Sequence, residues 1–252
     1  MCGRYALKTD PKLIAKQFGV DQAVISGSYL GMLGGPTIPA EQLTAQMLLP
    51  SFNIAPTHKV PAIFQVDGQR TMAAVQWGLI PSWAKDPSIG SRMINARVET
   101  IFEKPSFRSA AEKRHCIVPA DGWFEWQTLG PRKKAPHYFS RIDGSVLGLA
   151  GIYESWRDPK GEEIWTFSLI TNDARSPFSE IHDRMPLLVP EQCAEIWLTQ
   201  GVEAVATIRS QQVPMSELTQ WEVGPAVGQV RNNNPKLIEP VDPEDDTLPL
   251  FR

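Results

Sequence analysis

The sequence predicts an α+β fold in which antiparallel sheets dominate. Three observations support this class. Apolar runs of about four to eight residues, bounded by turn signals, recur from residue 60 onward. Helical patterns are few and short, and the strands do not alternate with helices as they do in βαβ folds. With 252 residues, 42% of them hydrophobic, the chain is long enough to bury one sizeable core.

The N-terminal segment predicts a short strand followed by a small amphipathic helix. The strand is expected around residues 3–7. Thr9 and Asp10 are typical N-cap residues, and Pro11 suits the first turn of a helix. Gly19 marks its end. The residues expected on one face of this helix are Leu13, Ile14, Gln17 and Phe18.

Residues 26–51 are rich in Gly, Pro and Ser and show little periodicity, so they predict an insertion or a long connecting loop. A β-hairpin is expected after it. Residues 60–66 and 72–80 read as its two strands, and Asp67 and Gly68 supply the turn signal between them.

The remainder of the chain predicts further strands and two helices. The strands are expected at 115–120, 122–127, 138–142, 146–154, 164–171 and 185–190. Helical patterns cover 105–113 and 190–200, and the second ends at Gly201. Residues 241–252 are acidic and Pro-rich and predict a flexible tail, so the expected domain spans 1–240.

Hydropathy and charge bear on location and partners. The longest apolar runs fall well short of the roughly 20 residues of a membrane span, and the N-terminus lacks the hydrophobic stretch of a secretory signal. We therefore expect a cytoplasmic protein with no membrane partner. A net charge of -3 argues against a globally basic nucleic-acid binder, although it leaves a local basic cleft open.

The cysteines and histidines predict neither a disulfide framework nor a metal centre. Cys2, Cys116 and Cys193 form an odd and sparse set, which fits a reducing compartment. They lack the paired spacing of zinc ligands, and the four histidines are scattered along the chain. We therefore expect no metal and no cofactor.

Cys2 is the first candidate for chemistry. It is followed by Gly3, and initiator methionine is usually removed before small side chains, which would leave an amine and a thiol on one residue. Both groups ordinarily titrate near pH 8. The thiolate could attack an acyl group, or the amine could form an imine with an aldehyde that the thiol then closes into a thiazolidine ring. A buried bystander cysteine is the plain alternative.

Three polar residues stand inside otherwise apolar segments. Glu125 lies among aromatic residues and, if it points inward, would have the raised pKa of a general acid or base. His182 could move protons, and Asn95 could donate from its amide. The alternatives are an outward-facing glutamate, a structural histidine and an asparagine that caps a turn.

Arginine and tryptophan residues alternate in several segments, as in proteins that hold phosphates and stack on bases. The arginines are Arg4, Arg92, Arg97, Arg108 and Arg184, and the tryptophans are Trp77, Trp83, Trp123 and Trp126. Most tryptophans of a globular chain belong to its core, so composition alone leaves DNA binding open. Arg97 and Glu99 could instead form a simple surface pair.

Six ordered segments resemble one family. They are MCGRYA at 1–6, FNIAPT at 52–57, WGLIPSWAKD at 77–86, INARVET at 94–100, ADGWFEW at 120–126 and IHDRMP at 181–186. Together they are similar to the SOS-response-associated peptidase (SRAP) family, and a late VRNNNPKLIEP segment extends the resemblance. It departs from the family at the long 26–51 segment and at Ala84, where some members carry a second aromatic residue.

The resemblance implies a single domain with an open barrel-like core and the function of an abasic-site sensor. Cys2 would be linked as a stable thiazolidine to the sugar aldehyde of an abasic site in single-stranded DNA, protecting that site during the DNA damage response. Asn95 is implied to position the cysteine and the opened sugar. Glu125 is implied to support proton transfer and crosslink reversal, and His182 to assist ring opening and imine chemistry.

The resemblance also implies DNA-contacting positions, with an aromatic wedge beside the lesion. These positions are Arg4, Asn53, Pro56, Trp83, Arg97, Thr171 and Arg184. The expected partners are single-stranded DNA with abasic sites and proteins of replication or repair, and the protein is expected to be a nucleoid-associated monomer. A lyase activity on the abasic site is a further expectation.

Three rival functions remain open. An N-terminal-nucleophile amidohydrolase, such as a glutamine amidotransferase, can also begin Met-Cys-Gly, although its supporting arginine and Asn-Gly motifs are not evident. A thiol protease or autopeptidase would use the Cys2 thiolate. A noncatalytic single-strand binder would use the tryptophans and arginines and bind intact and abasic strands equally.

Overall fold

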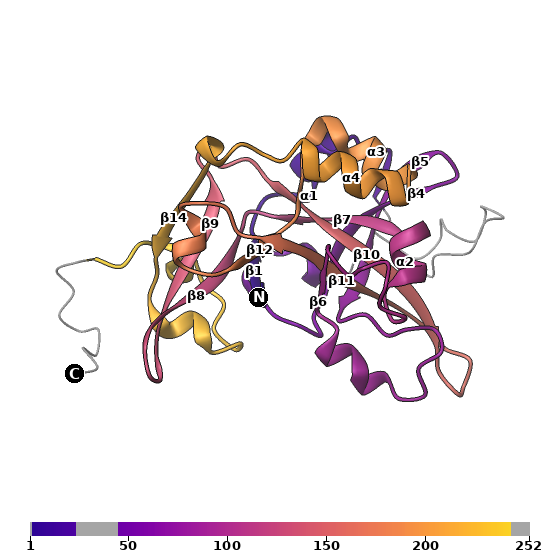
Figure 1. Cartoon of the computed structure of the whole chain (residues 1–252), viewed down its shortest axis with the longest axis horizontal. Coiled ribbons are helices and arrows are strands. Elements are labelled where there is room, and N and C mark those ends of the chain that lie inside the picture. The colour runs from indigo at the N-terminus through magenta and orange to yellow at the C-terminus, as the bar shows by residue number, and fades with distance from the viewer. Residues whose placement is uncertain (1, 24–44, 243–252) are drawn as a thin grey trace.

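Two β-sheets form the centre of the protein in the computed structural model, which describes residues 2–23 and 45–242 (Figure 1). The first sheet has five strands in the order β14-β9-β8-β1-β3, all paired antiparallel. Their bounds are β14 Leu218–Glu222, β9 Lys133–Arg141, β8 Gly122–Gly130, β1 Arg4–Leu7 and β3 Ser51–Ile54.

The second sheet follows the order β12-β11-β10-β7-β4-β5-β2, with β13 paired to β10 and β6 paired to β11. The bounds are β12 Arg184–Pro186, β11 Glu163–Asp173, β10 Leu147–Arg157, β7 His115–Ala120, β4 Lys59–Val66, β5 Gln69–Trp77, β2 Gln22–Ala23, β13 Leu188–Val189 and β6 Asn95–Arg97. A parallel pairing of β11 with β5 joins both ends of the β5-β4-β7-β10-β11 path. The predicted barrel-like core is confirmed, and this pairing closes it.

A shared hydrophobic core connects the two sheets. Tyr5 of β1 packs on Trp77 of β5 with ring centroids 5.4 Å apart, and Trp77 stacks on Phe167 of β11 at 6.1 Å. All three side chains are fully buried. Because residues alternate across a strand, the opposite face of the five-stranded sheet carries Phe124 and Tyr138, which pack in a smaller cluster against the C-terminal segment. The predicted α+β class with mainly antiparallel sheets is confirmed.

The strand predictions agree well with the structure. The expected hairpin is formed by β4 and β5, which pair from Lys59–Gln76 to Val66–Gln69. The expected single strand over 185–190 is wrong in detail, because β12 pairs with β11 whereas β13 pairs with β10. The short strands β2, β3, β6 and β14 were not predicted, since their few residues carry no periodicity long enough to detect.

The helices are short and lie at the rim of the sheets (Figure 1). The α-helices are α1 Pro11–Gln17, α2 Arg108–Lys113, α3 Ala194–Thr199 and α4 Val202–Ser210, and 3-10 turns cover η2 Ala45–Leu48, η3 Pro87–Arg92, η4 Phe178–Glu180, η5 Glu191–Cys193, η6 Met215–Glu217, η7 Pro225–Gly228 and η8 Pro235–Ile238. Asp10 caps α1 by accepting from the Lys12 amide at 2.7 Å, as predicted. The α4 helix was missed because Gly201, taken as a stop signal, turns the chain directly into another helix.

Two predicted segments fall partly or wholly on residues 24–44 and 243–252, which lie outside the described residues. Of the 26–51 loop, the described part forms η2 and the first residue of β3. Most of the predicted 241–252 tail lies outside the described residues as well. Across 2–23 and 45–242, no helix combines the length and apolar character needed to span a membrane.

Candidate active site

The four residues predicted to be catalytic lie together where the two sheets meet. Cys2 lies two residues before the start of β1, and Glu125 lies on β8, the strand beside β1 in the five-stranded sheet. Asn95 begins β6 and His182 comes just before β12, and both of these strands pair with β11 of the other sheet. In Figure 1 the start of the chain is near the centre of the molecule, beside β1, β6 and β12.

Cys2 is held by its backbone rather than by its side chain. The side-chain amide of Asn95 donates to the Cys2 carbonyl oxygen at 2.7 Å. The thiol is fully buried, with the Arg4 carbonyl 3.9 Å from Sγ. Burial raises the pKa of the Cys2 thiol, and the nearby Glu125 carboxylate raises it further. The thiol is therefore neutral at physiological pH in this environment.

Glu125 and His182 face each other across the junction. The Nε2 atom of His182 lies 3.8 Å from an oxygen of Glu125. Glu125 is 2% exposed, and burial raises its pKa to about 7. Burial lowers the pKa of His182, whose Nδ1 atom accepts from the Arg184 amide at 3.0 Å. A carboxyl group that titrates near neutral pH beside a neutral imidazole is well suited to proton transfer.

Asn95 is half-buried at the start of β6 and keeps one acceptor available. Its Nδ2 atom is used by the Cys2 carbonyl, whereas its Oδ1 atom is buried and has no hydrogen-bond partner among the described residues. A buried amide oxygen without a partner is uncommon in a native protein. The site therefore presents an unused acceptor next to the backbone of Cys2.

Arg184 and Arg97 belong to one side of the site but differ in their surroundings. Arg184 is buried and donates to Glu99 at 2.9 Å and 3.0 Å, to Asp173 at 2.5 Å and to the Thr171 carbonyl at 2.6 Å. Arg97 is exposed and lies opposite Thr171 in the β6–β11 register. The surface pair of Arg97 with Glu99 considered from the sequence is not formed, because Glu99 binds Arg184.

Arg4 and Asn53 form a second group on the adjacent strands β1 and β3. Arg4 donates to Asn53 Oδ1 and to the Val227 carbonyl, both at 2.9 Å. The buried Asn53 amide donates to three backbone carbonyls between Val227 and Asn232 at 3.0–3.2 Å. These contacts fasten the start of the chain to the C-terminal segment, and the predicted DNA contacts of both residues stay predictions.

Trp83 and Pro56 lie in loops of the nine-stranded sheet. Trp83 is 60% exposed although it is a large aromatic residue. Its loop is anchored to β10, because Trp156 Nε1 on that strand donates to the Ala84 carbonyl at 2.7 Å. Pro56 is half-buried in the turn before β4. The exposed indole on an anchored loop agrees with the wedge role that the sequence predicted, which stays a prediction.

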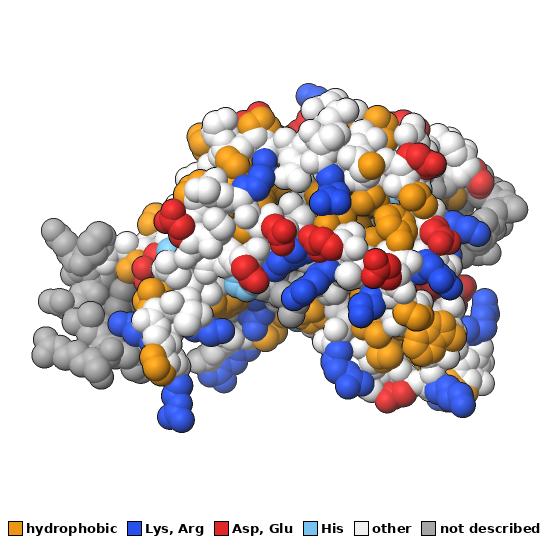
Figure 2. Space-filling model, in the orientation of Figure 1, with side chains coloured by type: hydrophobic (Ala, Val, Ile, Leu, Met, Phe, Trp, Pro, Cys, Tyr) orange, Lys and Arg blue, Asp and Glu red, His pale blue; other side chains and the backbone are white. Residues whose placement is uncertain are grey.

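The surface near the N-terminus is hollowed. Figure 2 shows an indentation in the lower edge of the molecule between the β8–β9 hairpin and the segment that follows β5. Lys and Arg side chains gather on both sides of it. Asp and Glu side chains lie above the indentation as well, so the local basic cleft that the net charge left open stays a prediction.

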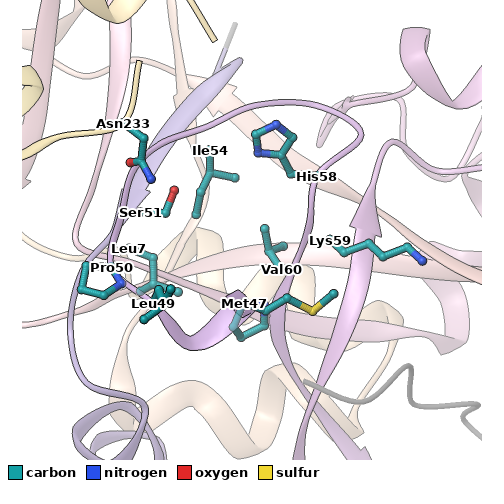
Figure 3. Close-up of a pocket in the computed structure, with 11 residues that line it drawn as sticks. Leu7, Met47, Leu49, Pro50, Ser51, Ile54, His58, Lys59, Val60 and Asn233 are labelled. Carbon is teal, nitrogen blue, oxygen red and sulfur yellow. The ribbon is translucent and has the colours of Figure 1, made fainter. Parts of the chain in front are cut away.

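A separate pocket of about 450 Å³ lies between β3 and β4 (Figure 3). Its walls are mainly aliphatic and include Leu7, Leu49, Ile54 and Val60, with His58 at its edge. None of the residues predicted to be catalytic or to bind DNA lines it. We therefore assign it no part in the candidate site.

The fold and the site define a protein with one main core, in which Cys2 lies at the junction of two sheets together with a carboxyl group that titrates near neutral pH and an imidazole. The chain belongs to the family described as SOS response associated peptidase (SRAP), whose family model matches residues 1–230.

Named relatives and a solved structure agree with this assignment. The chain is 34% identical over 241 residues to the abasic site processing protein YoqW of Bacillus subtilis, covering 95% of this chain and 99% of the relative. It is 35% identical over 193 residues to the abasic site processing protein YedK of Escherichia coli, covering 75% and 84%. A crystal structure of a Bacteroides thetaiotaomicron protein matches with a TM-score of 0.77 at 26% identity, covering 96% and 100%.

Sequence reasoning missed two residues that shape the site. Glu99 lies within the INARVET segment, so a signal was present, but its partner was taken to be Arg97. Asp173 is the last residue of β11 and carries no pattern of its own. Both were missed as partners of Arg184 because the pairing depends on β11 and β12 lying side by side.

Proposed function

We propose that this protein processes abasic sites in single-stranded DNA by covalent capture through Cys2. The observation that carries the proposal is the environment of Cys2, which is held by its carbonyl at 2.7 Å from Asn95 while the thiol stays buried and neutral. This arrangement leaves the α-amine, released by removal of Met1, as the group that reacts first. The family and the names of the relatives support the same class of substrate.

The chemistry balances with the groups present. The amine adds to the ring-opened sugar aldehyde, and loss of one water gives an imine. The thiol sulfur then adds to the imine carbon while its proton passes to nitrogen, which closes a thiazolidine. Glu125, with a pKa of about 7, is suited to give a proton to the departing water and to accept one from the thiol. His182 would draw a proton from the sugar hydroxyl during ring opening, a role that its lowered pKa supports.

DNA binding is proposed for the basic cleft. Arg97 is exposed and free to meet a phosphate, and Trp83 presents an indole to an unstacked base. An abasic nucleotide needs no base to be extruded, so the cost of reaching the sugar is reduced. Crosslink reversal and lyase cleavage of the strand use the same imine and belong to this proposal as secondary outcomes.

Intact mass spectrometry tests the proposal most directly. We expect the purified protein to lack Met1 and to gain the mass of an abasic oligonucleotide minus one water. Glutamine hydrolysis with release of ammonia, or no mass gain with an abasic strand, would contradict it. The acyl-transfer rivals require a thiolate, and burial of Cys2 disfavours that form.

A further inference from the structure

We propose that the tip of the β8–β9 hairpin is a second DNA-binding element, which holds backbone phosphates of the single strand flanking the abasic nucleotide. The inference rests on the proposed function and extends it to a surface outside the catalytic group. The tip is defined by residues 128–134, and its cations are Arg132, Lys133 and Lys134.

The charge of the tip is unbalanced. The three cations are consecutive and exposed, and in the described part of the chain none of them forms an ion pair. The exposed Leu129 lies across the turn, with 52% of its surface accessible. Three free cations beside an exposed aliphatic side chain match a single strand, whose phosphates and unstacked bases are both accessible.

The hairpin continues the strand that carries Glu125. The β8 and β9 strands pair from Gly122–Ser140 to Gly130–Lys133, with a register shift between Thr128 and Gly130, so the paired strands set the position of the tip relative to the site. Leu129 is four positions after Glu125, which is about 13 Å of extended strand. For a strand stacked as in B-form DNA, which rises about 3.4 Å per nucleotide, this distance corresponds to about four nucleotides. The tip therefore lies within reach of DNA bound at Cys2.

A groove connects the site with the hairpin. A pocket of about 320 Å³ runs between His182 and Thr128, with Trp126 and Gln127 in its β8 wall. That volume is at the lower end of the range in which proteins bind small organic groups, about 300–1,000 Å³.

The charge of the opposite wall determines which part of a nucleotide this groove would accept. That wall carries Glu180 and Asp183, which would repel phosphates and accept hydrogen bonds from base amino groups. The phosphates would then follow the β8–β9 side. Lys134 lies close enough to the site to add to the lowering of the His182 pKa that burial causes.

The test compares binding of two triple variants to an oligonucleotide that carries a stable tetrahydrofuran analogue of the abasic nucleotide. The first is Arg132→Ser, Lys133→Ser and Lys134→Ser. The matched control is Lys12→Ser, Lys16→Ser and Lys160→Ser, which removes three exposed cations from α1 and from the turn between β10 and β11. The analogue has no aldehyde, so binding is measured without covalent capture.

We expect the slope of log K against log salt to be less steep by about 2 in the hairpin variant. Each lost phosphate contact with a single strand reduces the slope by about 0.7, and the variant loses three. Over a fourfold range of salt this is a difference of about 16-fold in affinity. The control should keep the wild-type slope. An unchanged slope in the hairpin variant, or an equal loss in the control, would overturn the inference.

A second comparison locates the contact. The difference in salt dependence between the hairpin variant and the wild type should shrink when the strand on one side of the lesion is shortened from about eight nucleotides to about two. The shortened strand no longer reaches the tip. An equal effect with about two nucleotides on both sides would overturn the inference. Failure of the wild-type protein to capture an abasic aldehyde, with the slope difference intact, would instead refute the proposed chemistry and leave the hairpin contact standing.

Discussion

The two sheets contribute to the candidate site in different ways. The five-stranded sheet supplies Cys2 and Glu125, which are 0% and 2% exposed. The nine-stranded sheet supplies Asn95 and His182, which are half-buried at strand ends. Contacts of 2.7 Å from Asn95 to the Cys2 carbonyl and 3.8 Å from His182 to Glu125 cross the junction. The reactive groups are thus on the enclosed side, and the groups that position them are on the accessible side.

This difference ranks the expected effects of mutation. Changes on the five-stranded side should remove the chemistry, because they delete the reacting atoms or the proton carrier. Changes on the nine-stranded side should leave those atoms in place and, apart from the proton transfer proposed for His182, alter their positions or the approach of DNA.

The largest effect is expected from Cys2→Ala, which deletes the sulfur proposed to close the thiazolidine. We expect no SDS-resistant adduct with an abasic single strand. Cys193→Ala is the control, because Cys193 lies in η5 and its thiol contacts Gln211 at 3.1 Å, outside the site. An SDS-resistant adduct of Cys2→Ala would show that the stable link does not need the sulfur of residue 2.

Glu125→Gln should slow capture by about 10²–10⁴-fold, the usual contribution of a positioned acid or base. The wild-type rate should change across the pKa of about 7, whereas the variant should lose this pH dependence. Capture rates measured between about pH 5 and pH 9 provide the check. A variant that keeps an inflection near neutral pH would assign it to a different group.

The same substitution should stabilise the fold at alkaline pH. The folded-state pKa of Glu125 lies above its unfolded value, so the folded carboxyl holds its proton more tightly and stability falls as pH rises from 4.5 to about 7. Glutamine does not ionise, so the variant does not lose stability in this way as the pH rises. We expect a gain in the free energy of unfolding of up to about 3 kcal/mol at pH 8 and under about 1 kcal/mol at pH 5, measured by urea unfolding. A gain that is equal at both pH values would contradict the titration.

Asn95→Ala should reduce the capture rate by about tenfold, since it removes one hydrogen bond to the Cys2 carbonyl. Asn95→Asp should reduce it further, because a carboxylate would face that carbonyl oxygen. Single-turnover rates at saturating DNA separate this effect from weaker binding. Equal rates for Asn95→Ala and the wild type would remove Asn95 from the positioning role.

Arg184→Ala and Arg97→Ala should show that one arginine stabilises the fold and the other binds DNA. Of the substitutions considered, these two should change the capture rate least. Arg184→Ala should lower the free energy of unfolding by about 1–3 kcal/mol, because it breaks the bonds to Glu99 and Asp173. Arg97→Ala should change stability by less than about 0.5 kcal/mol. For Arg97→Ala, the slope of log K against log salt for DNA binding should become less steep by about 0.7, as measured by fluorescence anisotropy. A strongly destabilised Arg97→Ala would contradict this division.

The strands of the barrel could be predicted from sequence because their apolar runs are long and bounded by turn signals. The β4–β5 hairpin is an example, since the turn at Asp67 and Gly68 lies between two such runs. The three-residue β6 strand could not be predicted, because its pairing with β11 is set by distant segments. The catalytic candidates came from ordered motifs, but the distances among them depend on how the two sheets pack.

The roles of the arginines show the same limit. Arg97 and Arg184 look alike in the sequence, each set in a short polar motif. Only the neighbours brought by β11 distinguish them, because Thr171 and Asp173 lie on that strand and Glu99 follows β6. The residue type therefore predicted that each arginine brings a cation to the site. Its burial and its partners could be known only from the tertiary structure.

The hydrogen bond from Asn95 to the Cys2 carbonyl has a consequence for the lifetime of the captured state. That oxygen is a spectator atom, since ring closure changes bonds at the amine and at Sγ only. The same 2.7 Å contact can therefore persist in the free and the linked protein. A restraint that is equal in the free and the linked protein leaves the balance between them unchanged, so a positioning contact that speeds capture would speed release of the sugar by the same factor.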